Sequence, residues 1–103
     1  MIARIWHGRV PAAKAARYRE FLNARAIPDY RAVHGNVSVR ILERADHEIT
    51  HFVCMTVWDS MAAIRAFAGD DVAVAKYYPE DSEFLLEFEP SVQHYEIVGS
   101  AGD

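Results

Sequence analysis

The alternation of apolar and polar residues along the chain predicts four strands. The alternation is clearest over 37–44 and 49–58, and shorter extended stretches cover 2–9 and 91–98. Residues 45–48 form the predicted hairpin loop between the two long strands. The stretch 49–58 is largely apolar in both of its phases, and a strand of that kind is covered on both of its faces.

Between the first two strands, the apolar residues have the spacing of a helix. Pro11 suits the first turn of a helix over 12–26, because the N–H that proline lacks has no partner there. We expect Pro28 to break or kink this helix, with a short turn over 29–33 and a tight turn at 34–36. The residues that share its apolar face are Ala15, Tyr18, Leu22 and Ala26.

A second helix follows the third strand. Asp59 or Ser60 caps its start and Gly69 ends it. The stretch 70–79 predicts a further short helical piece that ends before its proline, and 81–88 could continue as a helical turn. The apolar face of the second helix consists of Met61, Ile64 and Phe67.

The predicted order of elements is β-α-β-β-α-β, which is typical of a ferredoxin-like α+β sandwich. Both helices then cover one face of a four-stranded antiparallel sheet. Because the third strand is apolar on the other face as well, we expect a homodimer in which the two sheets pack face to face. Only the tail, residues 99–103, is expected to be disordered.

Composition narrows the classes of function. The 103 residues carry a net charge of −4, with no basic stripe, so we do not expect nucleic-acid binding. No apolar run is long enough for a membrane span, and the first residues lack the apolar core of a signal peptide. The single cysteine, Cys54, agrees with a reducing compartment, and we expect the protein in the cytoplasm.

Several stretches resemble the antibiotic biosynthesis monooxygenase family. They are "ARIWHG" at 3–8, "VWDS" at 57–60, "AAIRAFAGDD" at 62–71 and "HYEI" at 94–97. The resemblance covers residues 2–98 and implies one domain over 1–98 and a dimeric α+β barrel. Family members include cofactor-free monooxygenases of polyketide quinols, haem-degrading proteins and proteins without a known activity.

The haem-degrading branch differs from this chain at its iron ligand. That branch places a Trp nine residues after the strand-end Trp and an iron-ligating His ten residues further on. Counting from Trp58, these positions hold Phe67 and Tyr77. Although Tyr can ligate haem iron in other proteins, we expect no cofactor here.

The resemblance also implies the strand order 4-1-3-2, with strands 1 and 4 antiparallel and strands 1 and 3 parallel. In that arrangement His7 and His94 come close together, and Trp58 lies at the same edge of the sheet as His7. His51 is then expected at the opposite edge. A three-histidine metal site is therefore poorly placed, and we expect no bound metal.

The candidate site is a pocket between sheet and helices. Trp58, Phe67 and Tyr77 are its predicted substrate-binding residues, because aromatic walls suit a small apolar or aromatic ligand. His7 or His94 is the predicted general base, which deprotonates a phenol or quinol so that the anion itself reduces O₂. We expect His7 to face the helices and Trp6 to face the dimer interface, because neighbouring strand residues point to opposite faces.

Other interpretations use the same residues. Trp6, Trp58 and Phe67 also suit plain packing in a core or an interface, since large aromatics dominate both. The protein could be a cofactor-independent monooxygenase, a small-ligand-binding or stress-related dimer without turnover, or a purely structural barrel. Pocket size and the orientation of the two histidines distinguish these hypotheses.

Overall fold

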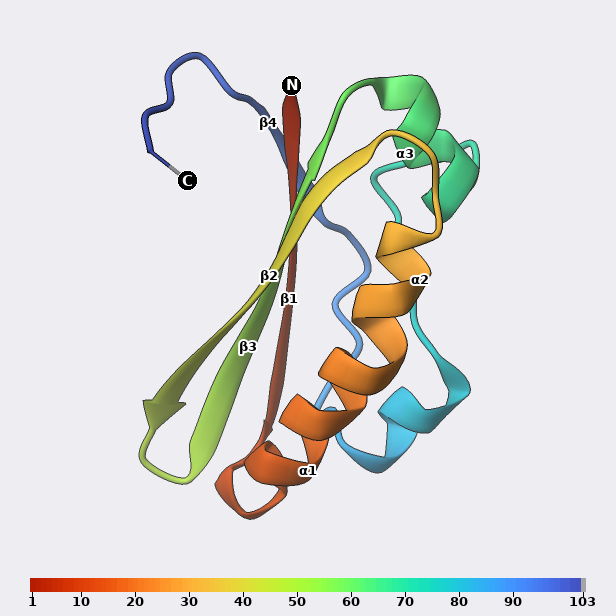
Figure 1. Cartoon of the computed structure of the whole chain (residues 1–103). Coiled ribbons are helices and arrows are strands. Elements are labelled where there is room, and N and C mark those ends of the chain that lie inside the picture. The colour runs from red at the N-terminus through yellow and green to blue at the C-terminus, as the bar shows by residue number, and fades with distance from the viewer. Residues whose placement is uncertain (103) are drawn as a thin grey trace.

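The computed structural model describes residues 1–102. It contains four strands and three α-helices, joined by a few shorter helical turns (Figure 1). The elements are, in chain order, β1 (Ile2–Pro11), α1 (Ala15–Phe21), α2 (Ile27–Arg31), β2 (Asn36–Asp46), β3 (Ile49–Trp58), α3 (Met61–Ala68) and β4 (Gln93–Glu96). The last strand is shorter than the expected 91–98, and the predicted disorder of the tail stays a prediction, its last residue lying outside the described part.

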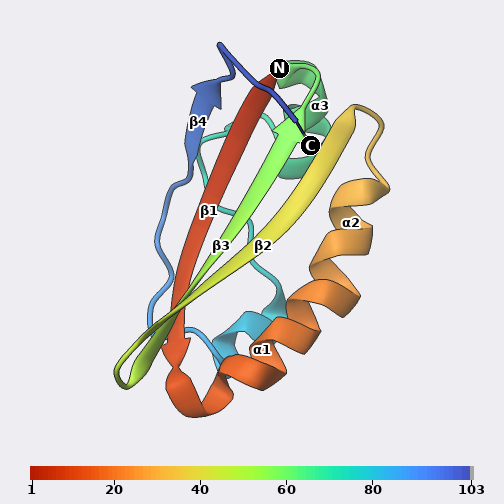
Figure 2. The same cartoon turned by 60° about the vertical axis from the view of Figure 1, so that its left-hand side comes forward.

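The four strands form one antiparallel sheet in the order β2-β3-β1-β4 (Figure 2). The ferredoxin-like fold and the strand order are confirmed. The expected parallel pairing of β1 and β3 is wrong, because β1 pairs antiparallel with β3 along its whole length. The helical crossover after β1 returns the chain so that β2 runs in the same direction as β1. The hairpin then reverses the chain, so β3 is antiparallel to both of its neighbours.

The first helical region is longer than the pattern predicts. A π-helical turn, Leu22–Ala26, links α1 to α2, and the helical path continues through Pro28 to Arg31. Proline lacks an N–H and crowds the carbonyl four residues before it, which here is that of Ala24. A π turn widens the spiral at that point, so the expected break at Pro28 does not occur.

Helix α3, which is the second helix that the sequence predicts, has the predicted ends. The Ser60 hydroxyl accepts a hydrogen bond from the Ala63 amide at 3.1 Å, and Gly69 follows the last turn with a φ of 94°. Beyond Gly69 the predicted helical piece is wrong. The segment 70–78 instead pairs with 90–92: the Ala75 amide donates to the Pro90 carbonyl, and the Ala73 carbonyl accepts from the Val92 amide.

The chain then returns along the free side of β1. A short 3₁₀ helix, Pro79–Glu83, replaces the expected helical turn over 81–88. Segment 84–92 then follows β1, and the Leu86 amide donates to the Arg9 carbonyl at 2.9 Å. This return places two carboxylates, Glu87 and Glu89, beside the strand that carries His7.

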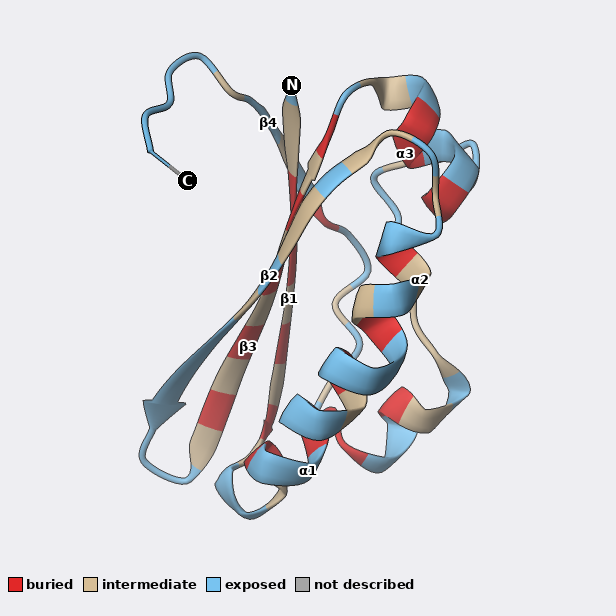
Figure 3. Ribbon diagram, in the orientation of Figure 1, coloured by how far each residue is buried: buried red, intermediate tan, exposed pale blue. Residues whose placement is uncertain are grey.

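All helices lie on one side of the sheet, and the core fills the space between (Figure 1). Buried and half-buried residues alternate along β3 and β1, so every second side chain faces the helices (Figure 3). The largest fully buried side chains include Trp58, Tyr18 and Phe52. No helix in the described part of the chain combines the length and apolarity that crossing a membrane requires.

The side chains on the sheet surface that no helix covers form what we call the open face. Its apolar members come from three strands, and its polar members lie toward the β2–β3 hairpin. The members are Ile5, His7 and Arg9 of β1, Leu42 and Arg44 of β2, and His51, Val53, Met55 and Val57 of β3.

Candidate functional site

Trp6 and His7 lie on opposite faces of β1, and the structure reverses the expected orientation. Trp6 is 6% exposed and faces the helices, where its ring meets Tyr77 edge to face with 6.0 Å between centroids. His7 lies on the open face, half-buried. The pleat of the strand forces the two rings apart, and the larger apolar ring occupies the helix-side core.

The expected meeting of His7 and His94 does not occur. β4 pairs with only the first part of β1, and His94 lies opposite Arg4. Directly paired residues share a face of the sheet, so His94 is on the helix side with Arg4. The two candidate bases are therefore three register positions and one sheet face apart.

Arg4 determines what His94 can do. Arg4 is 2% exposed, and its Nη1 lies 3.1 Å from His94 Nε2 and 2.6 Å from the Val72 carbonyl oxygen. Because arginine can only donate, His94 Nε2 is the acceptor and the ring proton is on Nδ1. Burial, and then the charge of Arg4, lower the pKa of His94. His94 is thus a neutral ring whose lone pair is already in use.

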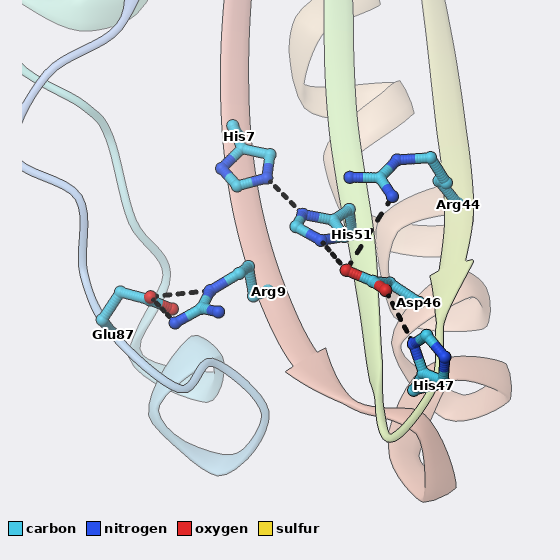
Figure 4. A network of polar contacts seen from close by, with 7 residues as sticks. All are labelled: His7, Arg9, Arg44, Asp46, His47, His51 and Glu87. Atoms are coloured by element: carbon cyan, nitrogen blue, oxygen red, sulfur yellow. Dashed lines mark hydrogen bonds and ion pairs between the residues drawn. The ribbon is translucent and has the colours of Figure 1, made fainter.

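A chain of polar contacts crosses the open face through His7. Glu89 Oε2 lies 2.5 Å from His7 Nδ1, and His7 Nε2 lies 2.9 Å from His51 Nδ1. His51 Nε2 continues to Asp46 Oδ2 at 3.4 Å, and the exposed His47 contacts the other oxygen of Asp46 at 3.1 Å (Figure 4). The expectation that His51 lies at the opposite edge from His7 is wrong, because β1 and β3 are antiparallel.

A second ion pair borders this chain. The Arg9 guanidinium donates from Nε and Nη2 to Glu87 Oε1, at 2.8 and 2.5 Å (Figure 4). Arg44 lies 3.9 Å from Asp46. The contact from His47, followed by that from His51, lowers the pKa of Asp46, so this carboxylate is ionised at neutral pH.

The open face is hollowed beside the two histidines. This open-face hollow has a volume of about 280 Å³, close to the lower limit of pockets that hold small molecules, about 300 Å³. Its lining combines apolar residues with charged or titratable ones. The lining residues are His7, Leu42, Glu43, Arg44, His51 and Val53.

The space between sheet and helices is much smaller than expected. Its cavity has a volume of about 10 Å³, room for about one water molecule, and is lined mainly by tyrosine, tryptophan and small apolar side chains. Two of the predicted substrate-binding residues are part of the surrounding core. Trp58 is fully buried, and Phe67 stacks on Tyr30 with 4.5 Å between ring centroids.

The third predicted substrate-binding residue, Tyr77, is tied to the segment that carries Glu89. Its hydroxyl donates to the Glu89 carbonyl oxygen, and its ring packs on Phe88 at 4.8 Å. Burial, helped by the charge of Glu89, raises the pKa of Tyr77 to about 12. A phenol that keeps its proton and uses it in this way does not suit the ligation of haem iron. The residues at this position do not fit the haem group.

Two members of the polar chain were missed by reasoning from sequence. His51 follows from the register as soon as β1 and β3 are paired antiparallel. Glu89 is 82 positions from His7 in the chain and reaches it only because segment 84–92 runs beside β1. No spacing rule points to a contact of that kind.

The fold has clear counterparts among solved structures. One is a protein from Nitrosomonas europaea described as a candidate antibiotic biosynthesis monooxygenase, at 18% identity and a TM-score of 0.69, covering 96% of this chain and all of that one. A second is MhuD, the heme-degrader from Mycobacterium tuberculosis, at 21% identity and a TM-score of 0.67, covering 99% of this chain and all of that one. A Bacillus cereus protein of the first description shares 14% identity at a TM-score of 0.66, covering 99% of this chain and 97% of its own.

These likenesses show the fold of the antibiotic biosynthesis monooxygenases over the full chain. No family model and no curated protein matches the sequence. At these identities the likeness extends to the fold alone.

Proposed function

We propose that the protein is a cofactor-independent monooxygenase that oxidises a small electron-rich aromatic compound, such as a phenol or quinol, with His7 as general base. The observation that supports this proposal is the contact of Glu89 with His7 beside the open-face hollow. A carboxylate on Nδ1 fixes the ring tautomer, so that Nε2 carries the lone pair. The proposed site is therefore in the hollow, and not between sheet and helices.

The chemistry needs a proton acceptor and O₂. A substrate hydroxyl entering the hollow would take the place of His51 as the partner of His7 Nε2 and give its proton to that nitrogen. The phenolate reduces O₂ by one electron, and the two radicals combine to form a C–O bond. The resulting peroxide takes the proton back from His7. It then loses water, made from its distal oxygen and the hydrogen of the ring carbon, and a carbonyl remains.

His94 is the weaker candidate for the base. Its Nε2 lone pair accepts from Arg4, and its pKa is lowered. A base at this position would first have to release a buried guanidinium. We therefore assign the proton transfer to His7 alone.

Binding without turnover is the alternative, and one observation favours it. Both ring nitrogens of His7 already have protein partners, Glu89 and His51. If a ligand does not displace His51, the hollow binds it and performs no chemistry. A hollow of about 280 Å³ allows either outcome.

We further infer that the protein is a homodimer that packs through the open face. Apolar side chains of three strands share this surface, and Leu42 remains 43% exposed in the single chain. A contiguous apolar surface marks an interface, and a second copy of the same sheet is its simplest cover. In such a dimer the hollow would lie between subunits, out of bulk water.

The test is O₂ consumption with a panel of dihydroxynaphthalenes and anthrones. We expect H7A to lower the rate by about 100-fold or more, the usual contribution of a general base. H94Q, on the other face of the sheet, should stay within about twofold of the wild type if it folds. Equal rates in all three proteins would rule out the base assignment. Saturable quenching of tryptophan fluorescence by the same compounds, without O₂ consumption, would establish the binding alternative.

A further inference from the structure

Four side chains form one continuous line of contacts on the open face: Glu89, His7, His51 and Asp46. They come from the segment after the 3₁₀ helix, from β1, from β3 and from the β2–β3 hairpin. The three contacts join Glu89 Oε2 to His7 Nδ1, His7 Nε2 to His51 Nδ1, and His51 Nε2 to Asp46 Oδ2. Figure 4 shows the two rings side by side between their strands.

The protons in this line can be counted. An ionised carboxylate only accepts, so the nitrogens that face Glu89 and Asp46 must each carry a hydrogen. A neutral imidazole has a single N–H. With both outer positions protonated, the two inner nitrogens, Nε2 of His7 and Nδ1 of His51, would face each other as bare lone pairs at 2.9 Å. One further positive group has to lie between them.

The distance decides which group that is. Two nitrogens that ligate the same tetrahedral metal ion at about 2.0–2.1 Å are about 3.3 Å apart. The observed 2.9 Å instead lies in the usual range of hydrogen bonds donated by an N–H, about 2.7–3.2 Å. No set of three or more metal-ligating side chains occurs in the described part of the chain. The position between Nε2 of His7 and Nδ1 of His51 therefore suits a proton.

We propose that His7 and His51 together bind a single extra proton, which they share between Nε2 and Nδ1 as an imidazole–imidazolium pair. Glu89 and Asp46 hold the two outer ends of this pair. The proposal rests on the contacts alone and does not depend on the oxygenase function. In this proposal the two imidazole rings on the open face form one binding site for one proton.

The surrounding charges favour one proton and disfavour two. The two contacting carboxylates supply two negative charges, while the nearby Arg9 is already paired with Glu87. Arg44 is 3.9 Å from Asp46, and the remaining charged residue that lines the hollow, Glu43, is paired with Arg19 of α1. A second proton would bring two N–H groups and two like charges together at 2.9 Å, where they repel each other.

The state of the pair changes the shape of the hollow that it lines. With the shared proton in place, the bond between the rings and their contacts with Glu89 and Asp46 hold both rings. Without it, and as long as the nitrogens that face Glu89 and Asp46 keep their hydrogens, two lone pairs oppose each other and one ring turns away. Loss of the proton therefore frees Nε2 of His7 for a ligand and alters the surface that faces outward from the sheet.

Nuclear magnetic resonance on the full chain labelled with ¹⁵N-histidine tests the proposal. We expect a two-bond ¹⁵N–¹⁵N coupling between His7 Nε2 and His51 Nδ1, and uptake of one proton by the pair between pH 9 and pH 5. In E89Q the midpoint at which the coupling disappears should move to lower pH by about one unit, because a contacting negative charge is removed. E87Q is the matched control, since Glu87 belongs to the same segment but contacts Arg9.

Two results would overturn the proposal. One is the absence of any coupling at every pH in a protein whose amide spectrum shows that it is folded. The other is independent protonation of the two rings, with two protons taken up over the same range and no response to E89Q. D46N provides a second variant at the opposite end of the pair, and it should shift the midpoint in the same direction as E89Q.

Discussion

Gly8 shows why the indole of Trp6 can lie flat against the sheet. A Cβ at position 8 would be 2.6 Å from Cη2 of Trp6 and 2.8 Å from Cδ2 of Leu85, so the ring fills the place of the missing side chain. The glycine belongs to the same face as Trp6, two residues along β1. The "WHG" sequence thus encodes close backbone approach on the helix side and, on the other side, an imidazole that contacts Glu89 and His51.

Gly35 combines backbone strain with a lack of space. Its φ is +98°, and an added Cβ would lie 2.5 Å from the Ala63 Cβ and 2.7 Å from Asp59 Oδ1. We expect G35A to lower the free energy of unfolding by about 2–4 kcal/mol, the sum of left-handed strain and overpacking. The measurement is the urea midpoint with its slope.

Gly69 is the matched control for this prediction. It has a similar φ of +94°, but no atom lies within 4 Å of the Cβ position, so G69A reports the strain alone. G35A should therefore cost more than G69A. Equal losses would show that the turn at Gly35 relaxes and that the contact with α3 is not tight.

The Arg4–His94 contact predicts a dependence of stability on pH. Because the pKa of His94 is lowered in the folded protein, its ring is neutral in both states above about pH 6.5, the ordinary value. Below that pH the unfolded chain binds the proton first, so stability falls as the pH falls. Carboxylates such as Asp29, whose pKa is lowered, add an acid-dependent loss of their own, which only a variant can separate.

The comparison is chemical unfolding of the wild type and H94Q between pH 7.5 and pH 5. The loss of stability on acidification should be smaller in H94Q, because this proton is no longer taken up by the unfolded state. H34Q, which changes a histidine in the turn before β2, is the control and should keep the wild-type slope. Identical slopes for the wild type and H94Q would contradict the prediction.

At the scale of elements, the sequence predicted what local signals encode. The two apolar phases of β3, the cap at Ser60 and the stop at Gly69 all rest on residues close in the chain, and the structure has all three. The wrong predictions concern segments whose structure depends on hydrogen bonds or packing with residues far away in the chain. Segment 70–78 is apolar enough for a helix but hydrogen-bonds to 90–92, and the π turn before Pro28 carries the helix past a residue that usually ends one.

The candidate site depends even more on contacts between residues that are distant in the chain. His7 was identified from its place in β1, but its partners depend on strand direction and on the return of segment 84–92 along the sheet. A single wrong choice, parallel instead of antiparallel, moved His51 from the side of His7 to the far edge of the sheet. The pairing register of the strands determines which candidate histidines are neighbours, and this register depends on residues that are far apart in the chain.

For the whole molecule, the open face is the feature that a single chain leaves unexplained. The helices cover one side of the sheet, and the described residues place no helix over the other (Figure 2). Met55 is at its centre, opposite Ile5 of β1 and Arg40 of β2. A carboxylate placed there would lose its hydration in a sheet-to-sheet dimer, a cost that a contact with the neighbouring Arg40 does not offset, but it would remain hydrated in a monomer.

We therefore expect M55E to convert a dimer into a monomer. Light scattering after size-exclusion chromatography at micromolar concentration should give twice the 11.7 kDa chain mass for the wild type and the single mass for the variant. A66E, on the exposed side of α3, adds the same charge to the helix layer and should remain dimeric. A folded wild-type monomer would contradict the interface, and so would a dimer of unchanged affinity in M55E. Either result would leave the open-face hollow facing bulk water.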